Sequence, residues 1–171
     1  MVGEIKPLEP PDSFHLRAGV GWLELGNHLE ANEELEQITP KMRAHPTVLV
    51  VRYEIYSKAK KWDGAAEIAS ALVKLLPERP EFWISLAYST RRKPGGGIPQ
   101  AKEVLTEARV KFPKEYMIAY NLACYECQLG NRKQAMQHLE EAIDLAGKKD
   151  IRQMAFDDPD LETLWADISE I

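Results

Sequence analysis

The sequence has few of the residues that crosslink small domains or hold metal ions. It contains two cysteines, Cys124 and Cys127, and four histidines. Two cysteines are too few for a secreted disulfide framework and indicate a reducing compartment. The histidines are scattered and form no metal-binding motif, and Cys-x-x-Cys inside a helix offers at most half a zinc site. We therefore expect no cofactor, no metal and no structural disulfide.

Long apolar runs and an excess of basic charge are also absent. No stretch is apolar and long enough to cross a bilayer, and the first residues contain no apolar run of signal-peptide length. We therefore expect a cytoplasmic protein without a membrane partner. The net charge of −5 argues against nucleic-acid binding, which requires a basic surface.

The charges that are present divide the chain into three parts. Residues 1–40 carry 2 basic and 8 acidic side chains, residues 41–111 carry 14 and 7, and residues 112–171 carry 6 and 12. A basic middle (+7) therefore separates two acidic ends (−6 each). Such a distribution allows the ends of one molecule to attract the middle of another.

A pattern of small and apolar residues repeats along the sequence. Alanine, leucine, alanine and proline occur at positions 101, 105, 108 and 113, and Ala135 follows Ala101 by 34 residues. The same intervals occur one unit earlier, at Ala65, Ala69, Leu72 and Pro77. These are spacings of amphipathic helices interrupted by turns. A period of 34 residues predicts a repeat of helix–turn–helix units.

The repeated residues resemble the tetratricopeptide family, whose consensus pairs a tryptophan with Leu-Gly and closes with proline. A fourth copy at the front has Trp22, Leu25-Gly26 and Pro46. The resemblance covers about residues 15–147 and implies an all-α solenoid of about four repeats. The turn between the paired helices reads as three or four residues short in the first two repeats and two residues longer in the third.

We expect the following division of the chain. Residues 1–13, with Pro7, Pro10 and Pro11, form an extended tail. The repeats cover about 14–45, 46–77, 78–113 and 114–147, and capping helices fill 148–171. Asp158-Pro159 is a good helix start, followed by apolar residues at helical spacing: Leu161, Leu164, Trp165 and Ile168. A cap is expected because a terminal repeat would otherwise expose its apolar face.

The family resemblance also implies a binding groove. In tetratricopeptide arrays the first helix of each repeat lines a concave surface through its second, fifth, ninth and twelfth positions. We set the first position at Gly19, Leu49, Pro80 and Tyr116. Candidates taken from these positions are Asn27, Tyr53, Lys60, Tyr88, Arg91, Tyr120 and Cys124. Asn121, at the sixth position of the last repeat, is added because the family also uses that position.

The chemistry of these candidates favours peptide binding. Tyrosines beside Lys60 and Arg91 are suited to stack on, and hydrogen-bond to, a peptide with acidic side chains. Asn27 and Asn121 match positions of the clamp that holds the C-terminal carboxylate of chaperones. The lysine of that clamp is missing, so we expect no chaperone-tail binding.

The predicted function is therefore a protein–protein interaction module, an adaptor or scaffold whose groove binds a peptide or helix of an unidentified partner. Two alternatives remain open: a secretion-type chaperone for an exported client, and homotypic assembly through the acidic ends and the basic middle. No enclosed pair of carboxylates is indicated, so we expect no enzymatic activity and no catalytic residue.

Overall fold

A computed structural model describes residues 6–170 of the chain. These residues form ten α-helices and two short 3-10 helices, and no strand occurs among them. The chain divides into two compact units, Met1–Gly95 and Gly96–Ile171, with the boundary in the glycine-rich turn. We describe each unit by itself.

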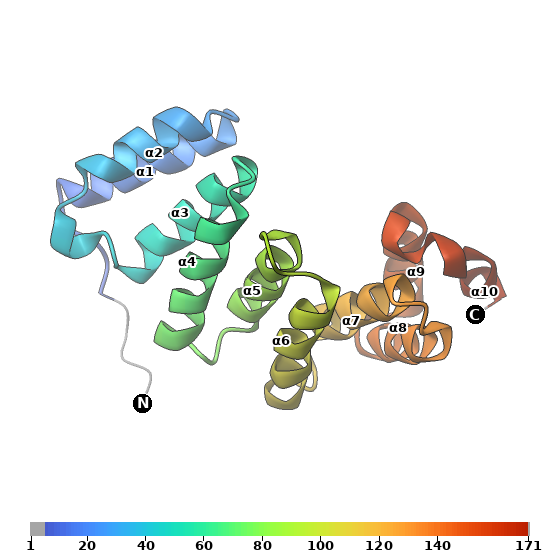
Figure 1. Cartoon of the computed structure of the whole chain (residues 1–171). Helices are drawn as coiled ribbons and strands as arrows, with labels where there is room; N and C mark the ends of the chain where they lie inside the picture. Colours follow the sequence, from blue (N-terminus) through green and yellow to red (C-terminus); the bar gives the residue numbers. More distant parts are fainter. Residues whose placement is uncertain (1–5, 171) are drawn as a thin grey trace. The chain divides into compact units, whose positions relative to one another are not determined.

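The first unit contains five α-helices. They are α1 (Asp12–Glu24), α2 (His28–Gln37), α3 (Pro46–Lys58), α4 (Trp62–Leu75) and α5 (Pro80–Arg92), with the 3-10 helix η1 (Pro40–Met42) between α2 and α3. Neighbours in sequence pack together: α1 on α2, α3 on α4, and α4 on α5 (Figure 1). Prolines at the first positions of α3 and α5 favour these starts, because proline lacks the N–H that a helix start leaves unpaired.

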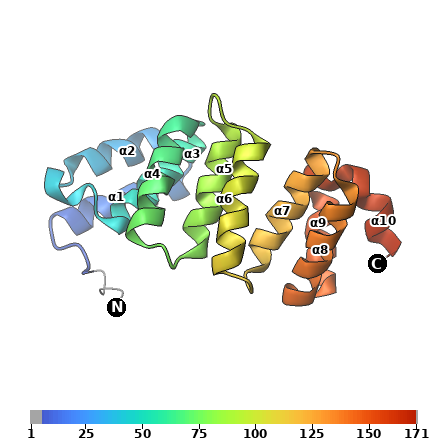
Figure 2. The same cartoon turned by 60° about the horizontal axis from the view of Figure 1, so that its bottom comes forward.

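The second unit contains the other five. They are α6 (Ile98–Lys111), α7 (Tyr116–Gln128), α8 (Arg132–Ala146), α9 (Lys148–Asp157) and α10 (Trp165–Glu170), with the 3-10 helix η2 (Pro159–Leu164) before α10. Helix α7 packs on α6, α8 and η2, and α8 packs on α9 (Figure 2).

The helix starts give the register of the repeat. The first helices begin at residues 12, 46, 80 and 116, which are 34, 34 and 36 residues apart. The last interval is longer because the turn at residues 93–97 has five residues, whereas the other three turns have three. The predicted starts at Pro80 and Tyr116 are correct. Those at Gly19 and Leu49 are wrong by seven and three residues, so the first two turns are not short.

Gly19 explains the error in the first repeat. A Cβ at this position would lie 3.3 Å from the Ala31 carbonyl oxygen and 3.4 Å from Leu35 Cδ2, so α1 and α2 approach each other closely here. The sequence pattern matches Gly26 to the Leu-Gly of the family consensus. Gly26 instead lies in the turn with φ of +79°, and a Cβ there would meet nothing within 4 Å. Trp22-x-x-Leu25-Gly26 therefore marks the end of α1 rather than its beginning.

The segment before α1 is attached to the first unit. Leu8 joins the buried core that α1, α2 and α3 share, and the Lys6 carbonyl oxygen lies 2.8 Å from His45 Nε2. Residues 6–9 have no regular structure, and α1 begins at Asp12. Residues 1–5 of the predicted tail lie outside the described residues.

The C-terminal segment closes the core of the second unit. Leu161, Leu164 and Ile168 are buried, as expected for a cap. Asp158 caps this segment, because its Oδ1 accepts a hydrogen bond from the Asp160 N–H at 2.9 Å. The first part is a 3-10 helix rather than the expected α-helix, and Trp165 Nε1 donates to the Ala155 carbonyl at 2.8 Å.

Candidate peptide-binding surface

The turns inside the repeats share one backbone feature. Each contains a residue with φ between +55° and +79°: Gly26, Lys60, Gly95 and Gly130. Glycine adopts this left-handed conformation without steric cost, whereas a Cβ is disfavoured there. Lys60 is the one non-glycine residue with positive φ in residues 6–170. The structure therefore places Lys60 in the turn after α3, and not on the helical face where the sequence register had put it.

Beside this turn, three side chains form what we call the aromatic–arginine cluster: Trp62, Tyr88 and Arg92. Trp62 begins α4, and Tyr88 and Arg92 are one turn apart near the end of α5. The rings of Trp62 and Tyr88 meet edge to face with centroids 5.7 Å apart. The Arg92 guanidinium carbon lies 3.4 Å from the Tyr88 centroid and 5.6 Å from that of Trp62. Each such cation–π contact contributes about 0.5–1 kcal/mol when exposed.

The cluster borders a pocket of about 390 Å³. Its lining is Lys60, Lys61, Trp62, Asp63, Gly64, Arg92 and Pro94. The pocket thus has three cations and one carboxylate. Among the described residues, no carboxylate lies within salt-bridge distance of Lys60, Lys61 or Arg92. The charge of this pocket is therefore suited to an anionic group.

The neighbouring lysine is also held by an aromatic ring. Lys61 Nζ lies 5.9 Å from the Tyr56 ring centroid. Tyr56 itself lies against α4 at Gly64, where a Cβ would come within 2.5 Å of the tyrosine ring. Gly64 thus leaves the space that Tyr56 needs. Arg92 is fixed in a similar way, because its Nη1 donates to the Tyr88 carbonyl at 3.0 Å.

Three other predicted groove residues of the first unit have different surroundings. Tyr53 is half-buried between α3 and α5, and its hydroxyl donates to the Ser85 carbonyl at 3.2 Å. Asn27 caps α2 by accepting from the Glu30 N–H at 3.2 Å, so it lies in a turn and not on a groove face. Arg91 precedes Arg92 in the last turn of α5 and is half-buried.

In the second unit, the predicted groove residues Tyr120 and Cys124 are covered by the C-terminal segment. Tyr120 is 4% exposed, and its hydroxyl donates to Asp158 Oδ2 at 3.2 Å. Cys124 Sγ lies 3.4 Å from the same oxygen. Burial, together with Cys124 and Asp158, raises the pKa of Tyr120 above its ordinary value. The cap therefore occupies the surface of these two residues, and a peptide has no access to it.

Asn121 and Cys127 also make internal contacts in the second unit. Asn121 Nδ2 donates to the Met117 carbonyl of its own helix at 2.7 Å. Cys127 Sγ lies 3.1 Å from Thr163 Oγ1 of η2. Both cysteines are buried and neither is in a disulfide. The cysteine pair therefore lies at the packing surface between α7 and the cap.

A buried ion pair links α6 and α7. Glu126 is 4% exposed, and its carboxylate lies 2.6 Å from Lys102 Nζ and 2.7 Å from Asn131 Nδ2. Burial opposes ionisation of Glu126, but the hydrogen bonds from Lys102 and Asn131 outweigh it and lower the pKa of the carboxyl. These contacts are internal to the unit and stabilise its packing.

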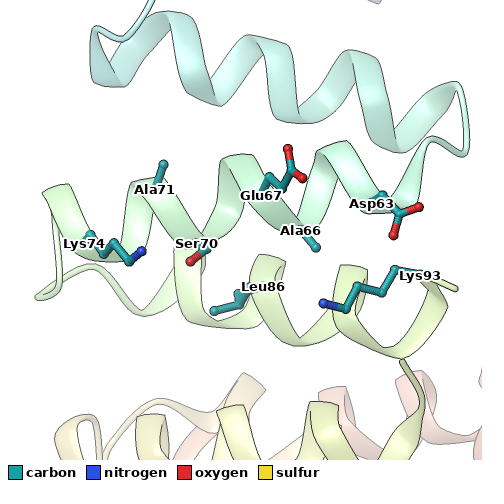
Figure 3. Close-up of a pocket in the computed structure, with 8 residues that line it drawn as sticks. All are labelled: Asp63, Ala66, Glu67, Ser70, Ala71, Lys74, Leu86 and Lys93. Carbon is teal, nitrogen blue, oxygen red and sulfur yellow. The ribbon is translucent and has the colours of Figure 1, made fainter. Parts of the chain in front are cut away.

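A second pocket lies between α4 and α5 and measures about 510 Å³ (Figure 3). Its lining is Asp63, Ala66, Glu67, Ser70, Ala71, Lys74, Leu86 and Lys93. Figure 3 shows Lys74 and Lys93 at opposite ends of this row, with Glu67 between them. Two carboxylates balance two ammonium groups, so the charge of this pocket indicates no class of ligand.

The structure thus brings together only part of the predicted site. Lys60 and Tyr88 belong to one surface, through the pocket and through Arg92. Sequence reasoning missed Trp62, Lys61 and Arg92. The sequence does indicate that Arg92 lies beside Tyr88, because residues four apart on one helix are neighbours on its surface. The sequence does not indicate that Trp62 lies beside Tyr88, because this contact arises from the packing of α4 on α5.

The architecture defines a class of protein. Helices pack against their neighbours along the chain, no strand occurs in residues 6–170, and the starts of successive units are 34 to 36 residues apart. This is an α-solenoid built from helix–turn–helix repeats. None of the helices described is long and apolar enough to span a membrane.

Solved structures identify the kind of repeat, although no family model and no curated protein matches the sequence. TTC0263, a thermophilic TPR protein of Thermus thermophilus, superposes with a TM-score of 0.68 at 21% identity, covering 92% of this chain and 82% of its own. YrrB, a TPR protein with an unusual peptide-binding site, superposes with a TM-score of 0.68 at 17% sequence identity. The match covers 86% of this chain and 75% of YrrB. MamA superposes with a TM-score of 0.68 at 14% sequence identity, and the match covers 89% of this chain and 88% of MamA. The chain therefore has the tetratricopeptide repeat fold, which confirms the predicted fold and resemblance.

Proposed function

We propose that this chain is a protein-interaction module that binds a segment of a partner polypeptide at the aromatic–arginine cluster. The observation that carries the proposal is the exposure of Tyr88, which remains 41% exposed although it contacts two other side chains. Tryptophan, tyrosine and arginine are the residues most enriched where binding energy concentrates in protein interfaces. Here one of each lies in a single cluster.

The geometry suits an extended chain. The rings of Trp62 and Tyr88 offer apolar surface at low entropic cost because each side chain has only two torsions. Arg92 is already oriented by the ring of Tyr88 and by its hydrogen bond to the Tyr88 carbonyl. Its side chain therefore loses little further conformational entropy when a peptide binds. The tetratricopeptide fold supports the same function, since repeat arrays present extended surfaces to partners. YrrB, which shares this fold, is described as having a peptide-binding site.

Selection from a random peptide library tests the proposal. Peptides enriched on the purified chain are labelled with fluorescein, and their dissociation constants are measured by fluorescence polarisation. Tyr88→Ala is expected to weaken binding by about thirtyfold or more, because hot-spot truncations cost about 2 kcal/mol or more.

The second unit offers a matched control. Phe156 is 36% exposed and has Arg152 5.8 Å from its ring centroid, so it is a similar aromatic–arginine pair. It borders its own basic pocket with Lys148 and Lys149. Phe156→Ala is expected to leave the affinity unchanged. Failure to enrich any peptide, or equal losses in the two variants, would contradict the proposal.

Exposed apolar side chains support homotypic assembly as a second candidate function. Phe14, Leu25 and Leu29 on or next to α1 and α2 are 54%, 77% and 66% exposed. Acidic residues flank them on α2, whereas the pocket near Lys60 is basic. Sedimentation velocity at low and high salt tests this candidate. Association that weakens with salt would favour it, and a monomer under all conditions would exclude it.

A further inference from the structure

Lys60 occupies a backbone position that the other repeats fill with glycine. The turns of the first, third and fourth repeats have Gly26, Gly95 and Gly130 at φ of 79°, 70° and 78°, and Lys60 has φ of 55°. The spacing between these residues is 34 or 35. Each of the four turns joins the first helix of a repeat to the second, so Lys60 can be compared directly with the three glycines. Lysine at this position strains the backbone in a way that glycine would not.

The side chain at this position borders a pocket, which the three glycines cannot do for their own turns. Lys60 lines the pocket with Lys61 and Arg92. The charges of these two neighbours are held beside aromatic rings, at 5.9 Å from Tyr56 and 3.4 Å from Tyr88. Lys60 thus adds a third cation to a site where Asp63 is the one carboxylate in the lining.

We propose that Lys60 is an affinity-determining residue for carboxylates, and that the partner segment bound at this pocket is an acidic stretch of polypeptide. This inference rests on the proposed function. Three cations suit two or three aspartate or glutamate side chains, while Trp62 and Tyr88 provide apolar surface for residues between them. A nucleic acid is disfavoured, because phosphate-backbone binding uses longer stripes of cations and the whole chain carries −5.

Two substitutions separate the charge of Lys60 from its backbone cost. Lys60→Gly removes the charge and relieves the backbone, so it should raise the midpoint of thermal unfolding, by about 1–4 °C, while lowering affinity. Lys60→Ala removes the charge and keeps the Cβ, so it should lower affinity without the gain in stability. Lys60→Arg keeps the charge and should retain most of the affinity.

The probes are the fluorescein-labelled peptides enriched in the library selection, each paired with a version in which Asp and Glu are replaced by Asn and Gln. We expect the enriched peptides to be acidic, and their neutral versions to bind about tenfold more weakly or worse. Lys60→Ala and Lys60→Gly should each lose about threefold to tenfold in affinity. A purely structural role for Lys60 would not give higher stability together with weaker binding.

Several results would overturn the inference. Enriched peptides that are neutral or basic, with binding still lost in Tyr88→Ala, would refute the acidic partner and leave the proposed function standing. Unchanged affinity in Lys60→Gly would refute the role of Lys60. Displacement of the peptides by a single-stranded DNA oligonucleotide of equal charge at lower concentration would assign the pocket to nucleic acid. A selection that enriches nothing would refute the proposed function itself.

Discussion

Gly19 and Gly21 lie on the same helix in different surroundings, so their substitution tests the register of the first repeat. A Cβ at Gly21 would meet nothing within 4 Å, whereas one at Gly19 would lie 3.3 Å from the Ala31 oxygen. Replacing glycine inside a helix by alanine or leucine gains about 0.5–1 kcal/mol. Gly21→Leu should show this gain. Gly19→Leu should lose about 1–3 kcal/mol, because its side chain must displace Ala31 and Leu35.

The difference between the two leucine variants is therefore expected to be about 1.5–4 kcal/mol. Urea unfolding followed by far-UV circular dichroism measures it, with the slope of the free energy against urea as a check that both variants unfold alike. Gly19→Ala should leave the free energy of unfolding nearly unchanged, because the gain in helix propensity and the crowding of the new Cβ against Ala31 nearly cancel. If Gly19→Leu were as stable as Gly21→Leu, α1 and α2 would not meet at Gly19, and the register described above would be wrong.

Two further substitutions test contacts outside the cluster. Glu126→Gln should lower the free energy of unfolding at pH 7 by about 1–3 kcal/mol, because it removes the negative charge from the buried pair with Lys102 and leaves one of the two donors, Lys102 or Asn131, without an acceptor. The pKa of Glu126 is lowered in the folded state, so the contribution of its carboxylate to stability is full above the ordinary value of 4.5 and is lost as pH falls through the lowered pKa. Urea unfolding of the wild type and of Glu126→Gln between about pH 7 and 3 should therefore show their free energies of unfolding converging. A difference in free energy that stays constant with pH would contradict the ion pair. Asn27→Ala should cost about 1 kcal/mol, since it removes the cap of α2, and should leave peptide affinity unchanged in the polarisation assay; weaker binding would restore Asn27 to the binding surface.

Much of the fold could be predicted because local spacing determines it. In the third and fourth repeats Ala101 and Ala135, which give the 34-residue period, are both buried. The first repeat was misread because Trp22-x-x-Leu25-Gly26 imitates the family pattern at the wrong end of α1. The apparent shortness of two turns was a sign of this error, since equal turns restore starts 34 residues apart.

The binding surface was harder to predict because it depends on contacts between helices. Lys60 and Tyr88 were recognised as surface residues, but Trp62 reaches Tyr88 through the packing of α4 on α5. Tyr120 and Cys124 looked equally available in the sequence. Asp158, which is 38 and 34 residues further along the chain, covers them both. A contact at that separation has no signal in helical periodicity.

Titration of the isotope-labelled chain with a selected peptide, followed by proton–nitrogen correlation spectra, tests the central claim most directly. The indole N–H of Trp62 and the guanidinium Nε–H of Arg92 report on the cluster, and the backbone N–H of Lys60 reports on the turn. All three signals should shift along one saturable curve with the dissociation constant found by polarisation. If they remained fixed while the signals of Phe156 and its neighbours moved, the peptide would bind elsewhere and the account of the site would be contradicted.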